Sequence, residues 1–191
     1  METLILGRPG AERSELIELL TDAGMTVHAC HEDAWGCAGL DDRCPLDARP
    51  LDAAIAVAPA GDALDPQGVA CARRARLPVI TVGGVDSDPI LRLADAEVRE
   101  VGPTIVELVR TVARDAMRHR VAIEEAAPDF LLAGERLEVD VRRIAGSLQI
   151  DIAGSFADDR IGQIADQVRA AARRFDPLAP SIDVSVTDRT D

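Results

Sequence analysis

The first two thirds of the chain alternate between short apolar runs and amphipathic stretches. The runs are rich in Ala, Val, Ile and Leu, which is typical of strands buried on both faces of a sheet. They predict strands over residues 3–7, 25–29, 51–59, 77–82 and 96–101. The stretches between them predict helices over 12–23, 69–76 and 104–126. Because strands and helices alternate, we expect an α/β domain with a parallel sheet and flanking helices.

After residue 127 the pattern changes to alternation of polar and apolar positions, which is typical of strands with one solvated face. The turn Ala145-Gly146 favours a hairpin. The predicted order is hairpin, amphipathic helix and final strand, at 136–143 with 147–152, 158–175 and 182–186. We therefore predict two domains, an α/β domain with a long last helix at 1–127 and a small ββαβ module at 128–191.

Composition narrows the possible chemistry. All 21 basic residues are arginine, so no lysine is available for a Schiff base or for a phosphate-binding loop. The formal net charge of −13 disfavours nucleic acid and anionic membranes as partners. No apolar segment approaches the roughly 20 residues that span a bilayer, so we expect a cytoplasmic protein without membrane insertion. In that compartment cysteines are typically free, metal-bound or redox-active.

The segment GRPGAERS, Gly7 to Ser14, lies where a strand turns into a helix. It partly matches the phosphate-loop pattern G-x-x-x-x-G-K-[ST], but Glu12 and Arg13 stand at two decisive positions. As a dinucleotide fingerprint it has Gly7 and Gly10, but Arg13 where a small residue belongs. One interpretation is a nucleotide- or dinucleotide-binding enzyme that uses Gly7, Gly10, Arg13 and Ser14. The other is a tight turn that caps a helix.

The order of elements in the first hundred residues resembles a response-regulator receiver domain of the CheY-like family. The likeness rests on LTDAGMTV, which leads into the second strand, and on LPVITV. It implies a flavodoxin-like parallel sheet and a phosphotransfer site with acidic residues, a hydroxyl residue and a lysine at strand ends. This chain instead has Gly7-Arg8, Ala58-Pro59 and Val82-Gly83-Gly84 at three of those places, and no lysine. The resemblance therefore implies a receiver that has lost phosphotransfer, and convergence on a common α/β layout is the alternative.

Residues 30–47, CHEDAWGCAGLDDRCPLD, gather three cysteines and the only tryptophan between two predicted strands. Zinc takes four N or S ligands, and iron-sulfur clusters take four thiolates. The candidate ligands are Cys30, Cys37, Cys44 and Cys71, with His28 and His31 as alternatives. Paired C-x-x-C knuckles are missing, so a reversible Cys37–Cys44 disulfide and adventitious thiols remain open. For Cys71 the competing interpretation is a buried small hydrophobe.

Arg110, Arg114 and Arg118 share one face of the predicted long helix because they are spaced by four residues. One interpretation is a solvated helix face. The other is a surface for an acidic protein partner or for dimerisation, which the receiver resemblance places on the last helix.

The C-terminal module resembles the alkaline-shock-protein family in the order and length of its elements. The likeness rests on RLEVDVRRIAGSLQIDIAG, then on IADQVRAAARRF and on the final IDVSV. It implies a non-enzymatic module that binds partner proteins, and its alternating strands also allow pairing in a homodimer. Together these features predict a regulatory or adaptor protein that senses redox state or a metal through the cysteine-rich loop. The nucleotide-binding enzyme is the alternative.

Overall fold

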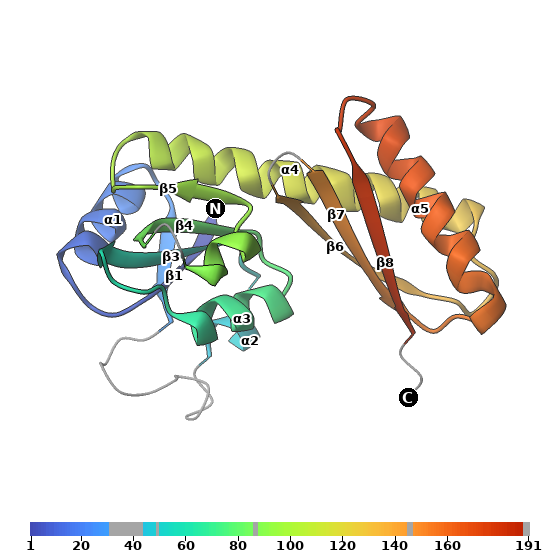
Figure 1. Ribbon diagram of the computed structural model, residues 1–191, viewed down its shortest axis with the longest axis horizontal. Helices are drawn as coiled ribbons and strands as arrows, with labels where there is room; N and C mark the ends of the chain where they lie inside the picture. The colour runs from blue at the N-terminus through green and yellow to red at the C-terminus, as the bar shows by residue number, and fades with distance from the viewer. Residues whose placement is uncertain (31–43, 49, 86–87, 145–146, 189–191) are drawn as a thin grey trace. The chain divides into compact units, whose positions relative to one another are not determined.

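The computed structural model describes residues 1–30, 44–48, 50–85, 88–144 and 147–188 (Figure 1). The chain forms two compact units, Met1–Ala113 and Arg114–Asp191. Within the described ranges, no helix is long and apolar enough to cross a membrane.

The first unit is built on a parallel sheet of five strands. The strands are β1 (Glu2–Leu6), β2 (Thr26–Ala29), β3 (Ala53–Ala60), β4 (Val79–Gly84) and β5 (Ala96–Val98). The helices are α1 (Ala11–Asp22), α2 (Pro45–Ala48), α3 (Pro66–Arg74) and α4 (Thr104–Ala126), with a 3₁₀ helix at Pro89–Leu93. The spatial order β2-β1-β3-β4-β5 is that of flavodoxin-like doubly wound sheets. The predicted fold class is therefore confirmed.

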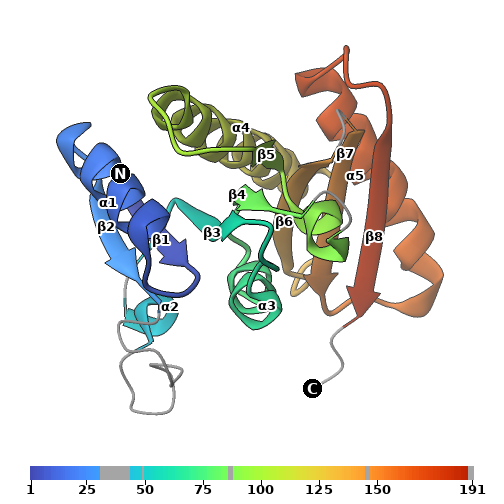
Figure 2. The ribbon, with the colours of Figure 1, turned by 60° about the vertical axis from the view of Figure 1, so that its left-hand side comes forward.

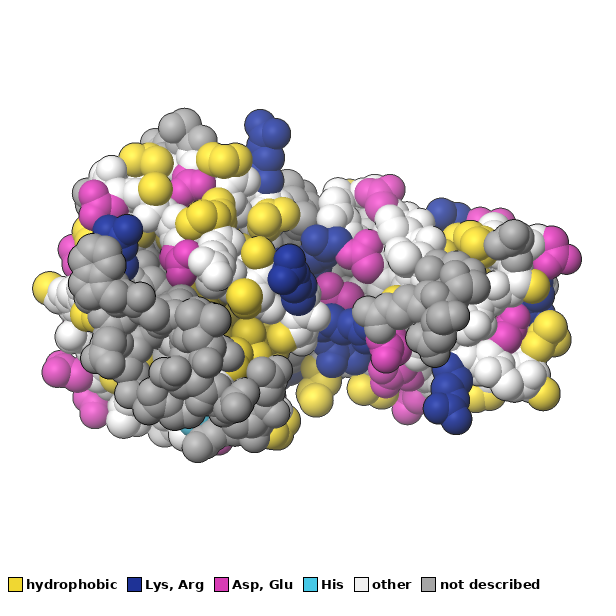
Figure 3. All heavy atoms as spheres, turned by 90° about the horizontal axis from the view of Figure 1, so that it is seen from below, with side chains coloured by type: hydrophobic (Ala, Val, Ile, Leu, Met, Phe, Trp, Pro, Cys, Tyr) yellow, Lys and Arg dark blue, Asp and Glu magenta, His cyan; other side chains and the backbone are white. Residues whose placement is uncertain are grey.

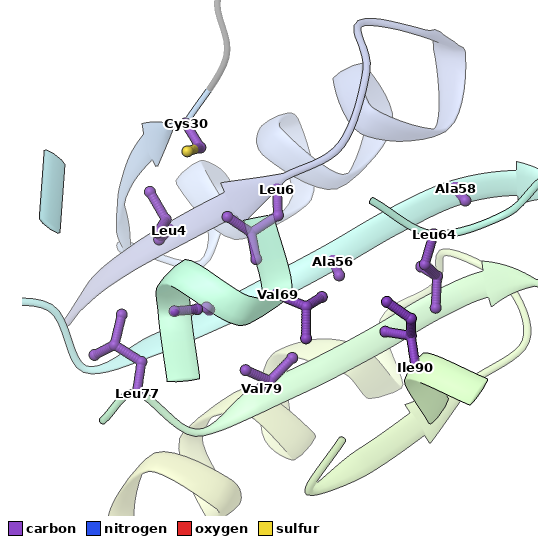
Figure 4. Packing of buried hydrophobic residues seen from close by; sticks show 12 residues of the cluster. Leu4, Leu6, Cys30, Ala56, Ala58, Leu64, Val69, Leu77, Val79 and Ile90 are labelled. Carbon is purple, nitrogen blue, oxygen red and sulfur yellow. The ribbon is translucent and has the colours of Figure 1, made fainter. Parts of the chain in front are cut away.

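Helices cover both faces of this sheet because apolar residues occupy successive strand positions, which point to opposite faces. Leu4, Leu6 and Ala56 pack with Val69 of α3 on one face (Figure 4). The other face carries Ile5, Ile55 and Ile80, which pack with Leu16 of α1 and Val109 of α4. Figure 2 shows α3 and α1 on opposite sides of the strands.

Two short elements of the first unit lie outside the predicted pattern. One is α2, Pro45–Ala48, and the other is the 3₁₀ helix Pro89–Leu93, and no helix was predicted at either place. Both begin with proline, which favours the first helical turn because its φ angle is preset and its missing N–H is not needed there. Both have five residues or fewer, too few to produce a helical period in the sequence.

The second unit contains the predicted ββαβ order. Its elements are β6 (Leu137–Ile144), β7 (Ser147–Gly154), α5 (Ile161–Phe175) and β8 (Ile182–Asp188). β6 and β7 are antiparallel, and β7 and β8 are parallel neighbours joined through α5. Apolar residues of all these elements form one core cluster, in which Ile150 of β7 and Val168 of α5 are fully buried.

Helix α4 contributes to both cores. Val109, in its first half, belongs to the core of the first unit, and Ile123, near its end, belongs to the core of the second. The division between units therefore falls within the helix, after Ala113. The predicted boundary after residue 127 lies at the end of the same helix.

Candidate functional site

In doubly wound folds, ligands bind at the carboxyl edge of the sheet. At this edge of the first sheet, two glycines lie so close to the backbone of β3 that a side chain would not fit. Gly7 follows β1 with φ +118°, and a Cβ added there would lie 2.2 Å from the carbonyl oxygen of Val57. Gly83 in β4 has φ +71°, and its Cβ would lie 2.2 Å from the carbonyl oxygen of Ala58. Neither position accommodates a side chain, so neither can carry a catalytic group.

The Gly7–Ser14 segment is held by its own polar side chains. The Arg13 guanidinium is buried and donates from Nη1 to the Gly7 carbonyl oxygen at 3.1 Å. The Ser14 hydroxyl donates to the Gly10 carbonyl oxygen at 3.0 Å. A surface hollow beside this turn is lined by Pro9, Arg13, Ser14 and Ile17. These bonds stabilise a strand-to-helix turn, and nucleotide binding at this segment stays a prediction.

Two carboxylates near this edge have structural hydrogen bonds that the sequence analysis did not anticipate. Asp65 caps α3 by accepting from the backbone N–H of Gln67 at 3.0 Å. Asp88 is buried and accepts from the N–H groups of Leu64 and Ile90, at 3.0 and 2.9 Å. Asp88 thereby ties the β3–α3 connection to the following 3₁₀ helix. The dipeptide Asp-Pro at both positions was the signal, since Asp as N-cap before Pro is a common helix start.

Three of the four predicted cysteine ligands lie in described parts of the chain. Cys30 follows β2 and is buried in the core cluster with Leu4 and Leu6 (Figure 4). Cys44 is half-buried just before α2, and Cys71 is half-buried in α3. Cys37 lies outside the described residues, as do His31 and Trp35. No group of three or more His, Cys, Asp or Glu in the described ranges is arranged to hold a metal ion. The four-cysteine site and the Cys37–Cys44 disulfide stay predictions.

His28, the alternative metal ligand, is engaged with a carboxylate. Its Nε2 lies 2.5 Å from Oε2 of Glu2, across the paired strands β1 and β2. The hydrogen bond from His28 is the main reason that the pKa of Glu2 is lowered from its ordinary value. His28 therefore contributes to pairing of the two strands.

The three arginines predicted to share one face of α4 have different surroundings in the structure. Arg110 bonds to Glu107 at 2.6 Å and donates to the carbonyl oxygen of Ala23, at the end of α1, at 3.1 Å. This places a cation at a helix C-terminus, where it is favourable. Arg114 and Arg118 are exposed, and no ion pair joins either to another described residue. Of the three arginines in this series, Arg114 and Arg118 therefore present their charge to solvent.

We expect Arg110→Ala to lower the free energy of unfolding by about 1 kcal/mol, because a charge-assisted hydrogen bond to Ala23 is lost. Arg118→Ala is the matched control and should change it by less than about 0.5 kcal/mol, as exposed positions do. Urea unfolding of both variants measures the difference. Equal effects would contradict the assignment of Arg110 to internal packing.

Acidic and basic side chains lie interspersed on the face of the molecule shown in Figure 3.

The fold defines a class, an α/β protein with a flavodoxin-like sheet and a separate ββαβ unit. No protein-family model matches the chain, and no curated protein matches it. Among solved structures it is similar to the periplasmic binding protein component of the arabinose ABC transporter from Shewanella sp. ANA-3, bound to α- and β-L-arabinofuranose, at 13% identity and a TM-score of 0.31. The match covers 98% of this chain and 54% of that protein, so the chain spans about half its length. A likeness at this level carries no conclusion about function.

Proposed function

We propose that this chain is a cytoplasmic, non-enzymatic regulatory or adaptor protein with a receiver-like first unit that has no phosphorylation site. The observation that carries the proposal is the carboxyl edge of the first sheet. Receivers need carboxylates at the ends of their first and third strands, and here Gly7-Arg8 and Ala58-Pro59 occupy those places. At Gly7 a Cβ would lie 2.2 Å from a carbonyl oxygen, so a carboxylate could not be introduced there without moving backbone.

The input that we propose is thiol redox state or a metal ion at Cys30, Cys37 and Cys44. Cys30 and Cys44 begin and end the connection between β2 and α2, so a change at the connection acts on elements that are packed on the first core. Oxidation of two thiols to a disulfide releases two protons and transfers two electrons to the oxidant. A metal would instead be held by thiolates.

The output that we propose is binding of an acidic protein partner through the second half of α4, together with the C-terminal module. Arg114, Met117, Arg118 and Val121 are exposed and follow the three- and four-residue spacing of one helix face. Met117 is 61% exposed and Val121 42% exposed. A stripe that combines guanidinium groups with exposed apolar side chains fits an amphipathic partner with carboxylates.

The test is elemental analysis and thiol titration of anaerobically purified protein, with fluorescence of Trp35 as the readout. We expect either stoichiometric zinc or iron, or the loss of about two thiols per chain on mild oxidation. Either response should disappear in Cys37→Ser and Cys44→Ser. For the loss of thiols on oxidation, Cys71→Ser is the matched control and should leave the response unchanged. Affinity for the proposed acidic protein partner should then differ between the two redox or metal states.

Full thiol content with no metal and no fluorescence response would refute the proposed input. A rise of several degrees in melting temperature with a nucleotide or with NAD(P) would instead favour the enzyme interpretation, because a ligand that binds only the native state raises its stability.

A further inference from the structure

Strand β8 is an edge strand of the second sheet: it pairs with β7 along one side only (Figure 1). The carbonyl oxygen of Ser181 accepts from the N–H of Leu148 in β7 at 3.0 Å. Because backbone groups of successive residues alternate sides along a strand, those of Ile182, Val184 and Val186 point away from β7. No strand pairs with this edge among the described residues. Arg169 donates to the carbonyl oxygen of Ile182 at 3.4 Å, at the start of the strand.

At the centre of β8, which reads IDVSVTD, the residues Val184, Ser185 and Val186 are symmetric about Ser185. In an antiparallel pair centred on Ser185, Val184 stands opposite Val186 of a second copy, and Ser185 stands opposite itself. The backbone N–H and C=O groups of Val184 and Val186 both point to the free edge. Val184 of one copy and Val186 of the other can therefore exchange backbone hydrogen bonds. The backbone therefore permits the register in which Val184 and Val186 are symmetric about Ser185.

The side chains of the five central residues, Asp183 to Thr187, are compatible with this register. Val184 and Val186 are half-buried and lie on the same face of the strand as Ile182, a member of the core, so their pairing extends an apolar surface. On the other face, exposed Ser185 meets its own copy, and Asp183 meets Thr187. No carboxylate among these pairs is opposite another carboxylate, which would be unfavourable. A second copy brings the same unpaired edge, so pairing of two copies satisfies both edges at once.

We infer that two copies of this chain associate through antiparallel pairing of their β8 strands about a two-fold axis at Ser185. Such pairing joins the two three-stranded sheets into one continuous sheet and covers the free edges at the interface. The inference does not depend on the proposed regulatory role, since it rests on the strand alone.

The register is tested by cysteine cross-linking of the full chain. In Ser185→Cys the two introduced residues form a non-hydrogen-bonded pair, with Cα atoms about 4.5 Å apart, within the range of disulfides. Under a mild added oxidant the two thiols lose two protons and two electrons and form an intermolecular disulfide. Thr187→Cys is the matched control on the same face of the strand. In this register Thr187 stands opposite Asp183 of the second copy, so the two introduced cysteines are four residues apart along the strand, more than about 10 Å. The unaltered chain sets the background from native cysteines.

The energetics are tested by charge exchange. Ser185→Glu and Ser185→Arg each place like charges at the axis, so each should weaken dimerisation at least about tenfold in sedimentation equilibrium. An equal mixture of the two variants should restore the dimer. Because Ser185 is exposed, neither change should alter the thermal unfolding of the monomer.

We expect a dimer of the unaltered chain, cross-linking of Ser185→Cys above the Thr187→Cys and native levels, and rescue by mixing. A chain that stays monomeric at about 100 μM, a concentration at which micromolar affinities are saturated, overturns the inference and leaves the edge to a strand of another protein. Cross-linking that does not exceed the control, or a Ser185→Glu dimer as tight as the native one, overturns it in favour of a different interface.

Discussion

Replacing Asp95 with alanine is expected to lower the free energy of unfolding of the first unit by about 3–5 kcal/mol, because it leaves a buried guanidinium without its carboxylate. Oδ2 of Asp95 lies 2.7 Å from Nη2 of Arg73, and the two side chains are only 4% and 10% exposed. The same oxygen accepts from the backbone N–H of Val79 at 2.7 Å. Arg73 also donates to the carbonyl oxygens of Leu77 and Leu93. This network joins α3 to the start of β4 and to the segment before β5.

Asp166→Ala is the matched control, since it breaks an ion pair with Arg169 whose side chains are 77% and 44% exposed. Its cost should be below about 0.5 kcal/mol because solvent screens the pair. Guanidinium unfolding followed by circular dichroism measures both. Similar costs for the two variants would contradict the buried network.

Gly7→Ala is expected to destabilise the first unit by about 3–5 kcal/mol, the combined effect of a backbone angle that L-residues avoid and a steric clash. The φ angle is +118°, and the new Cβ would lie 2.2 Å from the Val57 carbonyl oxygen. The ends of β1 and β3 would have to separate to admit a methyl group. The variant therefore tests the close approach of backbone that leaves no room for a side chain at this position.

Gly24→Ala separates the two contributions. Gly24 also has a positive φ, +78°, but a Cβ there would meet nothing within 4 Å. The substitution should therefore cost only the backbone term, about 1 kcal/mol. If Gly7→Ala cost no more than Gly24→Ala in the same unfolding measurement, the ends of β1 and β3 would not approach as described.

The sequence predicted the elements and the fold class because hydrophobic periodicity records burial. The unbroken apolar run that became β3, Ala53–Ala60, indicated a central parallel strand, and the alternation in β7 indicated a sheet with one covered face. The sequence also indicated that the Gly7–Ser14 segment lies at the carboxyl edge of the sheet, since it directly follows a predicted strand. The hydrogen bonds that these residues make there could not be predicted from the sequence.

Tertiary structure alone decided which side chains meet. Arg73 and Asp95 are 22 residues apart, and Arg110 and Ala23 are 87 apart, so no local pattern links them. Arg110 looked equivalent to Arg114 and Arg118 by helical spacing, and only packing on the end of α1 distinguishes it. The need for glycine at Gly7 likewise depends on a carbonyl oxygen from a different strand. Periodicity determines which face of an element is buried, whereas partners depend on how elements far apart in sequence come together in space.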